Sequence, residues 1–265
     1  MKKEMIFNKR GQMTMFIIIA ILIVSGIALL IFFNKGTPFT GGHQEINKKE
    51  FLENCVEEDI KNTLEIIGLQ GGYFSESKIM TKSFSSGSTY GQKNIAVLCY
   101  NKNYFDPCIN QDPMLIQHLN DEIKKGISKT VKDCFDALTL SLKNQGFDVE
   151  AKYNGFEVQL LPEKLKLDIK GEITISQTES TTKEKDFEIL FRTRLYDIAI
   201  VAQNIINQEA STCSFDHSGF MLYYKEFSID KIRTSDSFDI FAVKSKDSYE
   251  IFNFALRGCV IPPGV

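Results

Sequence analysis

The chain has 265 residues, of which 43% are hydrophobic, and its 31 basic and 34 acidic side chains give a formal net charge of −3. This balance, without the basic stripe that a phosphate backbone requires, excludes nucleic acid as an expected partner. The residues after position 33 are numerous enough to form one large domain or two small ones with their own cores.

An apolar run occupies residues 13–33, within a window between Arg10 and Lys35 that holds no charged residue. Roughly 20 helical residues cross a hydrocarbon core of about 30 Å, so the run predicts a transmembrane helix with the lipid bilayer as its partner. A secretory signal has a shorter core, of about 7 to 15 residues, and a small-residue cleavage site, which does not follow Phe33.

The basic residues before the run predict its orientation. They place a leader of residues 1–12 in the cytoplasm, because positive charge stays on that side, and they are Lys2, Lys3, Lys9 and Arg10. The chain from Asn34 onward is then expected outside the cell, which makes the protein a single-pass cell-membrane protein with an extracellular domain.

The junction between leader and apolar run carries a resemblance. Lys9-Arg10-Gly11-Gln12-Met13-Thr14 resembles the class III signal of archaeal type IV pilin-like proteins, in which a membrane prepilin peptidase cuts before the hydrophobic segment. The resemblance implies a prepilin-type peptidase as partner, cleavage between Gly11 and Gln12, and a retained helix able to pack against others in a filament. The sequence departs from bacterial-type pilins at Phe16, where many carry glutamate, and at the glycine and proline cluster of 36–42. The alternative is an uncleaved signal anchor.

Residues 34–45 are predicted to be a linker, since they contain glycine and proline, and a first subdomain is expected at 46–146. In it, apolar residues at helical spacing predict two helices, and two shorter apolar segments between them predict two strands. These elements are expected at 47–67, 75–84, 94–100 and 113–143.

The first of these helices carries a second resemblance. Phe51-Leu52-Glu53-Asn54-Cys55 and Gly68-Leu69-Gln70-Gly71-Gly72-Tyr73 are similar to a stretch of uncharacterised archaeal single-pass surface proteins. This similarity implies a shared envelope module and no known activity.

A second subdomain is expected at 147–265. Asn154-Gly155 is typical of a two-residue hairpin turn and predicts strands on both sides of it, while 165–175 alternates with period two as a further strand. A polar tip at 177–186, a strand at 187–191 and a helix at 193–209 follow. Strands are then expected at 220–224, 238–244 and 249–256, with 228–233 able to supply another. The fold class is α+β, a transmembrane helix followed by antiparallel sheets packed on amphipathic helices.

All six cysteines follow the apolar run, on the side where disulfides form and persist. Cys55 and Cys134 fall on the apolar stripes of two helices that should pack together, so they form the first expected pair. Cys99 and Cys108 suit a clip on a loop, which leaves Cys213 with Cys259. The alternative is that some are buried thiols that behave as small hydrophobic side chains.

No catalytic motif stands in the sequence, so neither an enzyme nor a cofactor is expected. His43, His118 and His217 are not at ligand spacing with one another or with a cysteine pair, and no metal is expected. Asp216-His217-Ser218 combines acid, base and hydroxyl, but a solvated turn explains these neighbours better than a triad does.

The sequence therefore indicates a membrane-anchored surface protein of pilin-like or adhesin-like type, which acts by contact, self-assembly or binding to other envelope proteins. The alternative is an uncleaved, anchored envelope accessory factor or enzyme whose site the sequence does not reveal.

Overall fold

The computed structural model describes residues 23–24, 47–75, 80–86, 91–103, 105–176, 180–257 and 259. The chain divides into two compact units, 1–45 and 46–265, and the elements below belong to the second. The basic leader with Lys9 and Arg10, the cut site at Gly11 and Gln12, and the predicted membrane helix lie outside the described residues, apart from the helical residues 23–24. Within the described ranges, no helix is both long and apolar enough to cross a membrane.

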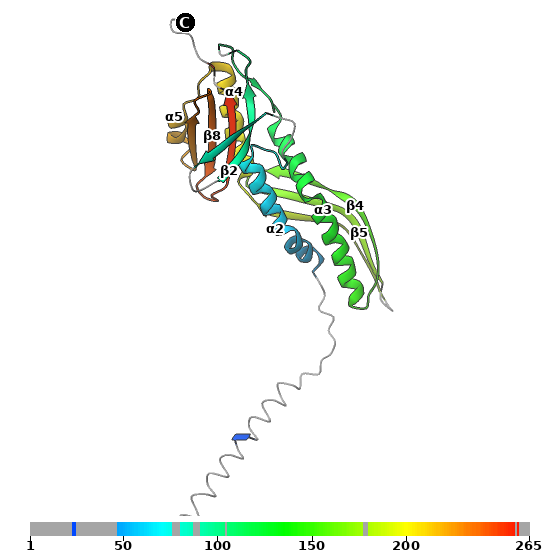
Figure 1. Cartoon of the computed structure of the whole chain (residues 1–265). Coiled ribbons are helices and arrows are strands. Elements are labelled where there is room, and N and C mark those ends of the chain that lie inside the picture. Colours follow the sequence, from blue (N-terminus) through cyan, green and yellow to red (C-terminus); the bar gives the residue numbers. More distant parts are fainter. Residues whose placement is uncertain are drawn as a thin grey trace, which may run out of the picture. The chain divides into compact units, whose positions relative to one another are not determined.

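Two helices, α2 (Lys48–Leu69) and α3 (Leu115–Asn144), confirm those predicted at 47–67 and 113–143. Asn47 begins α2, because its side-chain oxygen accepts a hydrogen bond of 3.2 Å from the Glu50 N–H, a donor that the first helical turn leaves unpaired. The helices pack side by side (Figure 1). The stripe that α3 buries comprises Leu115, Leu119, Ile123, Ile127, Val131, Cys134, Phe135, Leu138 and Leu142.

A three-stranded antiparallel sheet, β4-β5-β6, lies along α3 (Figure 1). Its strands are Asp148–Leu161, Lys164–Ser176 and Thr181–Arg192. Every second side chain of β5 is buried, which confirms the alternation predicted for this strand. The opposite face carries ion pairs, in which Lys166 Nζ lies 3.3 Å from Asp168 Oδ2 and 2.7 Å from Glu188 Oε2.

The prediction of a hairpin turn at Asn154-Gly155 is wrong. β4 continues through both residues as one strand, and its register with β5 shifts between Tyr153 and Phe156. Gly155 has a φ of 98°, which glycine adopts without strain, and it serves a bulge in the strand rather than a turn. The long pairing partner β5 overrides the local preference of the dipeptide.

The polar tip expected at 177–186 is also shorter than predicted, because β6 begins at Thr181. Its charged residues are stabilised across the sheet by Glu172, whose carboxylate oxygens lie 2.5 Å from Lys183 Nζ and 3.1 Å from Lys185 Nζ. The polar composition of this segment predicted a loop. In the structure its residues from Thr181 onward belong to β6, and ion pairs across the sheet stabilise that strand.

A second sheet has the order β1-β2-β9-β8-β7, with β3 (Ile109–Asn110) paired to β2. The other strands are Thr81–Ser86, Gly91–Tyr100, Ile251–Arg257, Phe238–Ser245 and Phe227–Arg233, in that order. β2 and β9 are parallel, whereas the prediction was of antiparallel sheets. Because β2 comes from the first predicted subdomain and β9 from the second, one sheet joins residues on both sides of position 146.

α4 (Leu195–Thr212) confirms the helix predicted at 193–209 and packs on β8 and β9. The strand predicted at 220–224 is wrong, since this segment lies in the short helix α5 (His217–Tyr223). Asp216 begins α5, because its carboxylate accepts a hydrogen bond of 2.9 Å from the Gly219 N–H. Phe220 and Tyr224 then stack with their ring centroids 4.4 Å apart. Their spacing of four residues, which places side chains on one face of a helix, was not recognised in the predicted strand.

The cysteines form the three pairs that the sequence analysis favours, and no cysteine is free. Cys55–Cys134 joins α2 to α3 across 79 residues, with the Cα atoms 5.9 Å apart. Cys99–Cys108 closes a loop between β2 and β3, and Cys213–Cys259 ties the end of α4 to the residues after β9. Cross-links of this kind stabilise the fold by restricting the unfolded chain.

The exposure of the three disulfides predicts the order in which a reductant opens them under native conditions. Cys55 is exposed, whereas Cys99 and Cys108 are only 0% and 4% exposed. We expect Cys55–Cys134 to be reduced first and Cys99–Cys108 last, because thiol attack needs access to sulfur. Limited reduction followed by alkylation and peptide mass mapping measures this order. Simultaneous release of all three pairs would show instead that reduction requires global unfolding.

Candidate functional site

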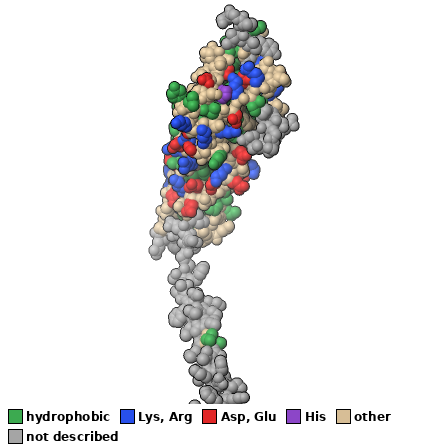
Figure 2. Space-filling view, turned by 90° about the vertical axis from the view of Figure 1, so that its left-hand side faces the viewer, with side chains coloured by type: hydrophobic (Ala, Val, Ile, Leu, Met, Phe, Trp, Pro, Cys, Tyr) green, Lys and Arg blue, Asp and Glu red, His purple; other side chains and the backbone are tan. Residues whose placement is uncertain are grey.

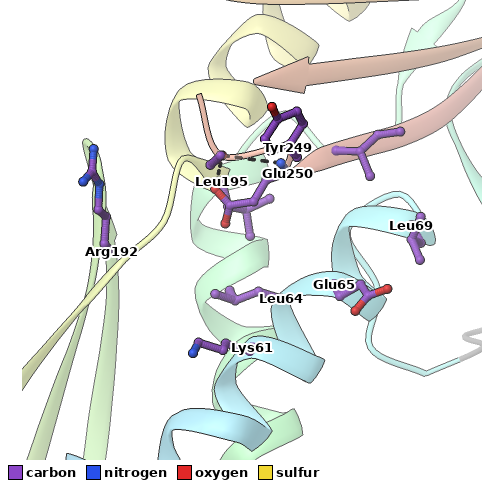
Figure 3. Close-up of a pocket in the computed structure, with 10 residues that line it drawn as sticks. Lys61, Leu64, Glu65, Leu69, Arg192, Leu195, Tyr249 and Glu250 are labelled. Atoms are coloured by element: carbon purple, nitrogen blue, oxygen red, sulfur yellow. Dashed lines mark hydrogen bonds between the residues drawn. The ribbon is translucent and has the colours of Figure 1, made fainter. Parts of the chain in front are cut away.

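A cleft of about 560 Å³ lies between α2, the junction of β6 with α4, and the turn that joins β8 to β9 (Figure 3). We call it the α2–β9 cleft. Its lining combines apolar residues with both signs of charge and consists of Lys61, Leu64, Glu65, Leu69, Arg192, Leu195, Ser248, Tyr249, Glu250 and Ile251. The volume lies in the range of small-molecule sites, about 300 to 1,000 Å³.

The Glu250 carboxylate fixes one wall of the cleft. Its Oε1 accepts a hydrogen bond of 2.5 Å from Thr193 Oγ1, and its Oε2 accepts one of 2.5 Å from the Arg194 N–H and one of 2.7 Å from Ser248 Oγ. Arg194 precedes the first turn of α4 and supplies no side-chain cap. Glu250 therefore caps this helix from a distant turn, where its negative charge also suits the positive end of the helix dipole.

Tyr249 projects from the same turn. It is 88% exposed, although its backbone φ of 61° lies in the left-handed region, which tyrosine seldom adopts. A hydrogen bond of 3.1 Å from its N–H to the Ser245 carbonyl holds this conformation. In Figure 3 the ring lies beside Leu195 and Glu250, at the edge of the cleft.

The opposite wall is α2, and Gly68 brings it close to β9. A Cβ atom at Gly68 would lie only 2.3 Å from the Ile251 carbonyl oxygen, so glycine is required for this approach. Lys61, Leu64 and Glu65 follow one another at helical spacing on the preceding turns. The cleft is thus bounded by backbone elements held in close contact.

A buried group of charges lies elsewhere, between α4, β7 and β8. Lys231 Nζ lies 3.0 Å from Glu209 Oε1 and 3.2 Å from Asp239 Oδ2, and the two carboxylate residues are only 1% and 0% exposed. Burial disfavours the ionised form of Asp239. Its hydrogen bonds from Arg233 and the charges of Lys231 and Arg233 outweigh that effect and hold the pKa of Asp239 below its ordinary value.

A third polar group joins the residues after α2 to the start of α3. Tyr73 donates a hydrogen bond of 2.7 Å to Asp112 Oδ2, and its ring lies 4.3 Å from that of His118. Burial first, and this hydrogen bond second, raise the pKa of Tyr73 above its ordinary value. His118 Nε2 lies 3.8 Å from the same carboxylate oxygen and has no hydrogen-bond partner among the described residues.

The residues predicted from the sequence lie away from the cleft. The paired cysteines cross-link the fold, and Asp216 caps α5 rather than acting with His217 and Ser218. In the described part of the chain, no group of three or more His, Cys, Asp or Glu side chains is placed to hold a metal ion. The cleft is not predictable from the sequence, because its walls come from separate segments and no motif marks them.

Gly68→Ala tests the close contact that forms the cleft. Alanine favours a helix by about 1 kcal/mol over glycine, but here its Cβ would collide with a carbonyl oxygen of β9. We therefore expect a net destabilisation of about 1 to 3 kcal/mol. Denaturant unfolding measures it, with Asn62→Ala on the exposed face of α2 as the control. Equal or greater stability of the Gly68 variant would contradict the contact.

Lys231→Met tests the buried charges. Removal of the lysine leaves two buried carboxylates without their shared partner, which should cost about 3 to 5 kcal/mol at neutral pH. This deficit should shrink as the pH falls, because Lys231 helps to lower the pKa of Asp239 and this stabilisation is lost once the carboxyl is protonated. Lys244→Met, which affects the exposed pair with Asp230, should cost less than about 1 kcal/mol. A deficit that does not depend on pH would indicate lost packing instead.

No family model, curated protein or solved structure matches this chain.

Proposed function

We propose that the protein is a single-pass membrane-anchored surface protein, cut between Gly11 and Gln12, whose external domain acts by contact or assembly in the manner of pilin-like or adhesin-like subunits. The observation that carries the proposal is the pairing of all six cysteines, every one of them downstream of the apolar run. Disulfides persist in oxidising compartments and are rare in the cytosol. The positive leader and the disulfides thus favour the same orientation.

Exposed apolar side chains support a role in contact. Leu222, Tyr223 and Tyr224 are 73%, 87% and 49% exposed at the end of α5. Phe105 and Ile109, near the Cys99–Cys108 loop, are 66% and 70% exposed. The face drawn in Figure 2 shows hydrophobic side chains in small groups among intermixed basic and acidic ones. Large contiguous apolar patches with a polar rim mark interaction sites, so we expect contact at the end of α5 and near the Cys99–Cys108 loop.

A second candidate function is that of an uncleaved, anchored envelope accessory factor. One observation favours it, the α2–β9 cleft, whose size suits a small ligand. A ligand-binding factor requires neither cleavage nor assembly, so processing separates the two candidates.

Intact mass of the protein from its native membrane tests the cut. We expect a chain that begins at Gln12, and we expect Gly11→Val to retain the leader, because a branched side chain at the cut should block a prepilin-type peptidase. Lys3→Gln, in the same leader, should still be processed. A native chain that begins at Met1 or Lys2 would contradict the pilin-like proposal and leave the accessory factor.

A further inference from the structure

The charged side chains of the α2–β9 cleft differ in how firmly they are bound to partners within the domain. The Arg192 side chain, at the end of β6, is exposed and makes no hydrogen bond or ion pair within the described part of the chain. Lys61 contacts Glu57 Oε1 at 2.5 Å, but this pair is exposed and easily exchanged for another anion. Glu250 is already bonded to three donors. Two cationic side chains thus remain available to an anion.

These cations lie on one side of the cleft. In Figure 3 Arg192 and the Lys61 amine lie on one side of the cleft, with the Arg192 guanidinium pointing away from Lys61, and the Glu65 carboxylate lies beyond Leu64 on the other side. An anionic group of a ligand fits the Arg192 side, where bidentate hydrogen bonds from guanidinium to carboxylate are available. Glu65 and Ser248 suit neutral hydrogen-bonding groups such as hydroxyls.

The remaining surface is apolar and includes an aromatic ring. Leu64, Leu195 and Ile251 contribute to the lining, and Tyr249 presents a ring that is 88% exposed. The turn already holds the backbone of Tyr249 in its left-handed conformation. Binding of a ligand to the ring would therefore cost no backbone freedom at this residue. The apolar face of a ring in the ligand would stack on this tyrosine.

We propose that the α2–β9 cleft binds a carboxylated sugar, with its carboxylate at Arg192, the C–H face of its ring on Tyr249, and its hydroxyls at Glu65 and Ser248. Sugar acids combine these three chemistries in one molecule of suitable size for a cleft of about 560 Å³. The source is either a free oligosaccharide or the end of a surface polysaccharide. The inference rests on the proposed function only for its location outside the cell.

Calorimetric titration of the full-length chain in detergent tests the inference, with digalacturonate and the neutral disaccharide maltose as probes. We expect digalacturonate to bind roughly tenfold or more tightly than maltose, and Arg192→Gln to remove most of this difference, since one charge-assisted contact is lost. Equal affinity for both disaccharides, or binding of neither, would overturn the proposal. A processed surface protein that binds neither probe would keep its proposed function and lose only this site.

Matched variants separate the cleft from general attraction to charge. Lys164→Gln removes a cation opposite Arg192 in the sheet but outside the cleft lining, so binding should be unchanged. Tyr249→Gly removes the ring and suits the left-handed backbone, so it should weaken binding roughly tenfold without unfolding the turn. Tyr223→Ala, an equally exposed tyrosine on α5, should have no effect.

Polygalacturonate distinguishes the two sources. Tighter binding of the polymer than of digalacturonate would indicate a surface polysaccharide, and similar affinity per site a free oligosaccharide, provided that Arg192→Gln and Tyr249→Gly weaken both. Polymer binding that both variants leave unchanged would reflect attraction to surface charge and would overturn the assignment of the cleft.

Discussion

The close contact of Gly68 with the Ile251 carbonyl oxygen is the constraint on which much of this domain depends. It joins the end of α2 to the first residue of β9, which is a central strand of the larger sheet. The same helix is cross-linked to α3 through Cys55 and tied at its start to β6, where Lys48 Nζ lies 2.5 Å from Glu184 Oε1. α2 thereby connects the two sheets, and the space left beside this contact is the α2–β9 cleft.

The sequence predicted the features that depend on local periodicity. The stripe of α3 repeats every three or four residues over the whole helix, and it placed Cys134 on the face toward α2, which made the pairing with Cys55 predictable. The alternation in β5 likewise marked its buried face. In these elements the intrinsic pattern and the tertiary environment favour the same structure.

Features that depend on distant segments were not predictable in this way. Asn154-Gly155 has the composition of a turn, yet pairing with β5 on both sides makes it a bulge. The parallel pairing of β2 with β9 joins residues about 160 positions apart, and no local pattern encodes it. The cleft is not predictable for the same reason, since Arg192, Lys61 and Tyr249 come from three separate segments that line it only in the folded chain.

The central claim is that this cross-linked domain lies outside the cell, and protease treatment of intact cells tests it most directly. We expect protease to remove the region after the linker from intact cells, while a cytoplasmic marker protein survives. Protection of the domain in intact cells, followed by its digestion only after lysis, would contradict the account.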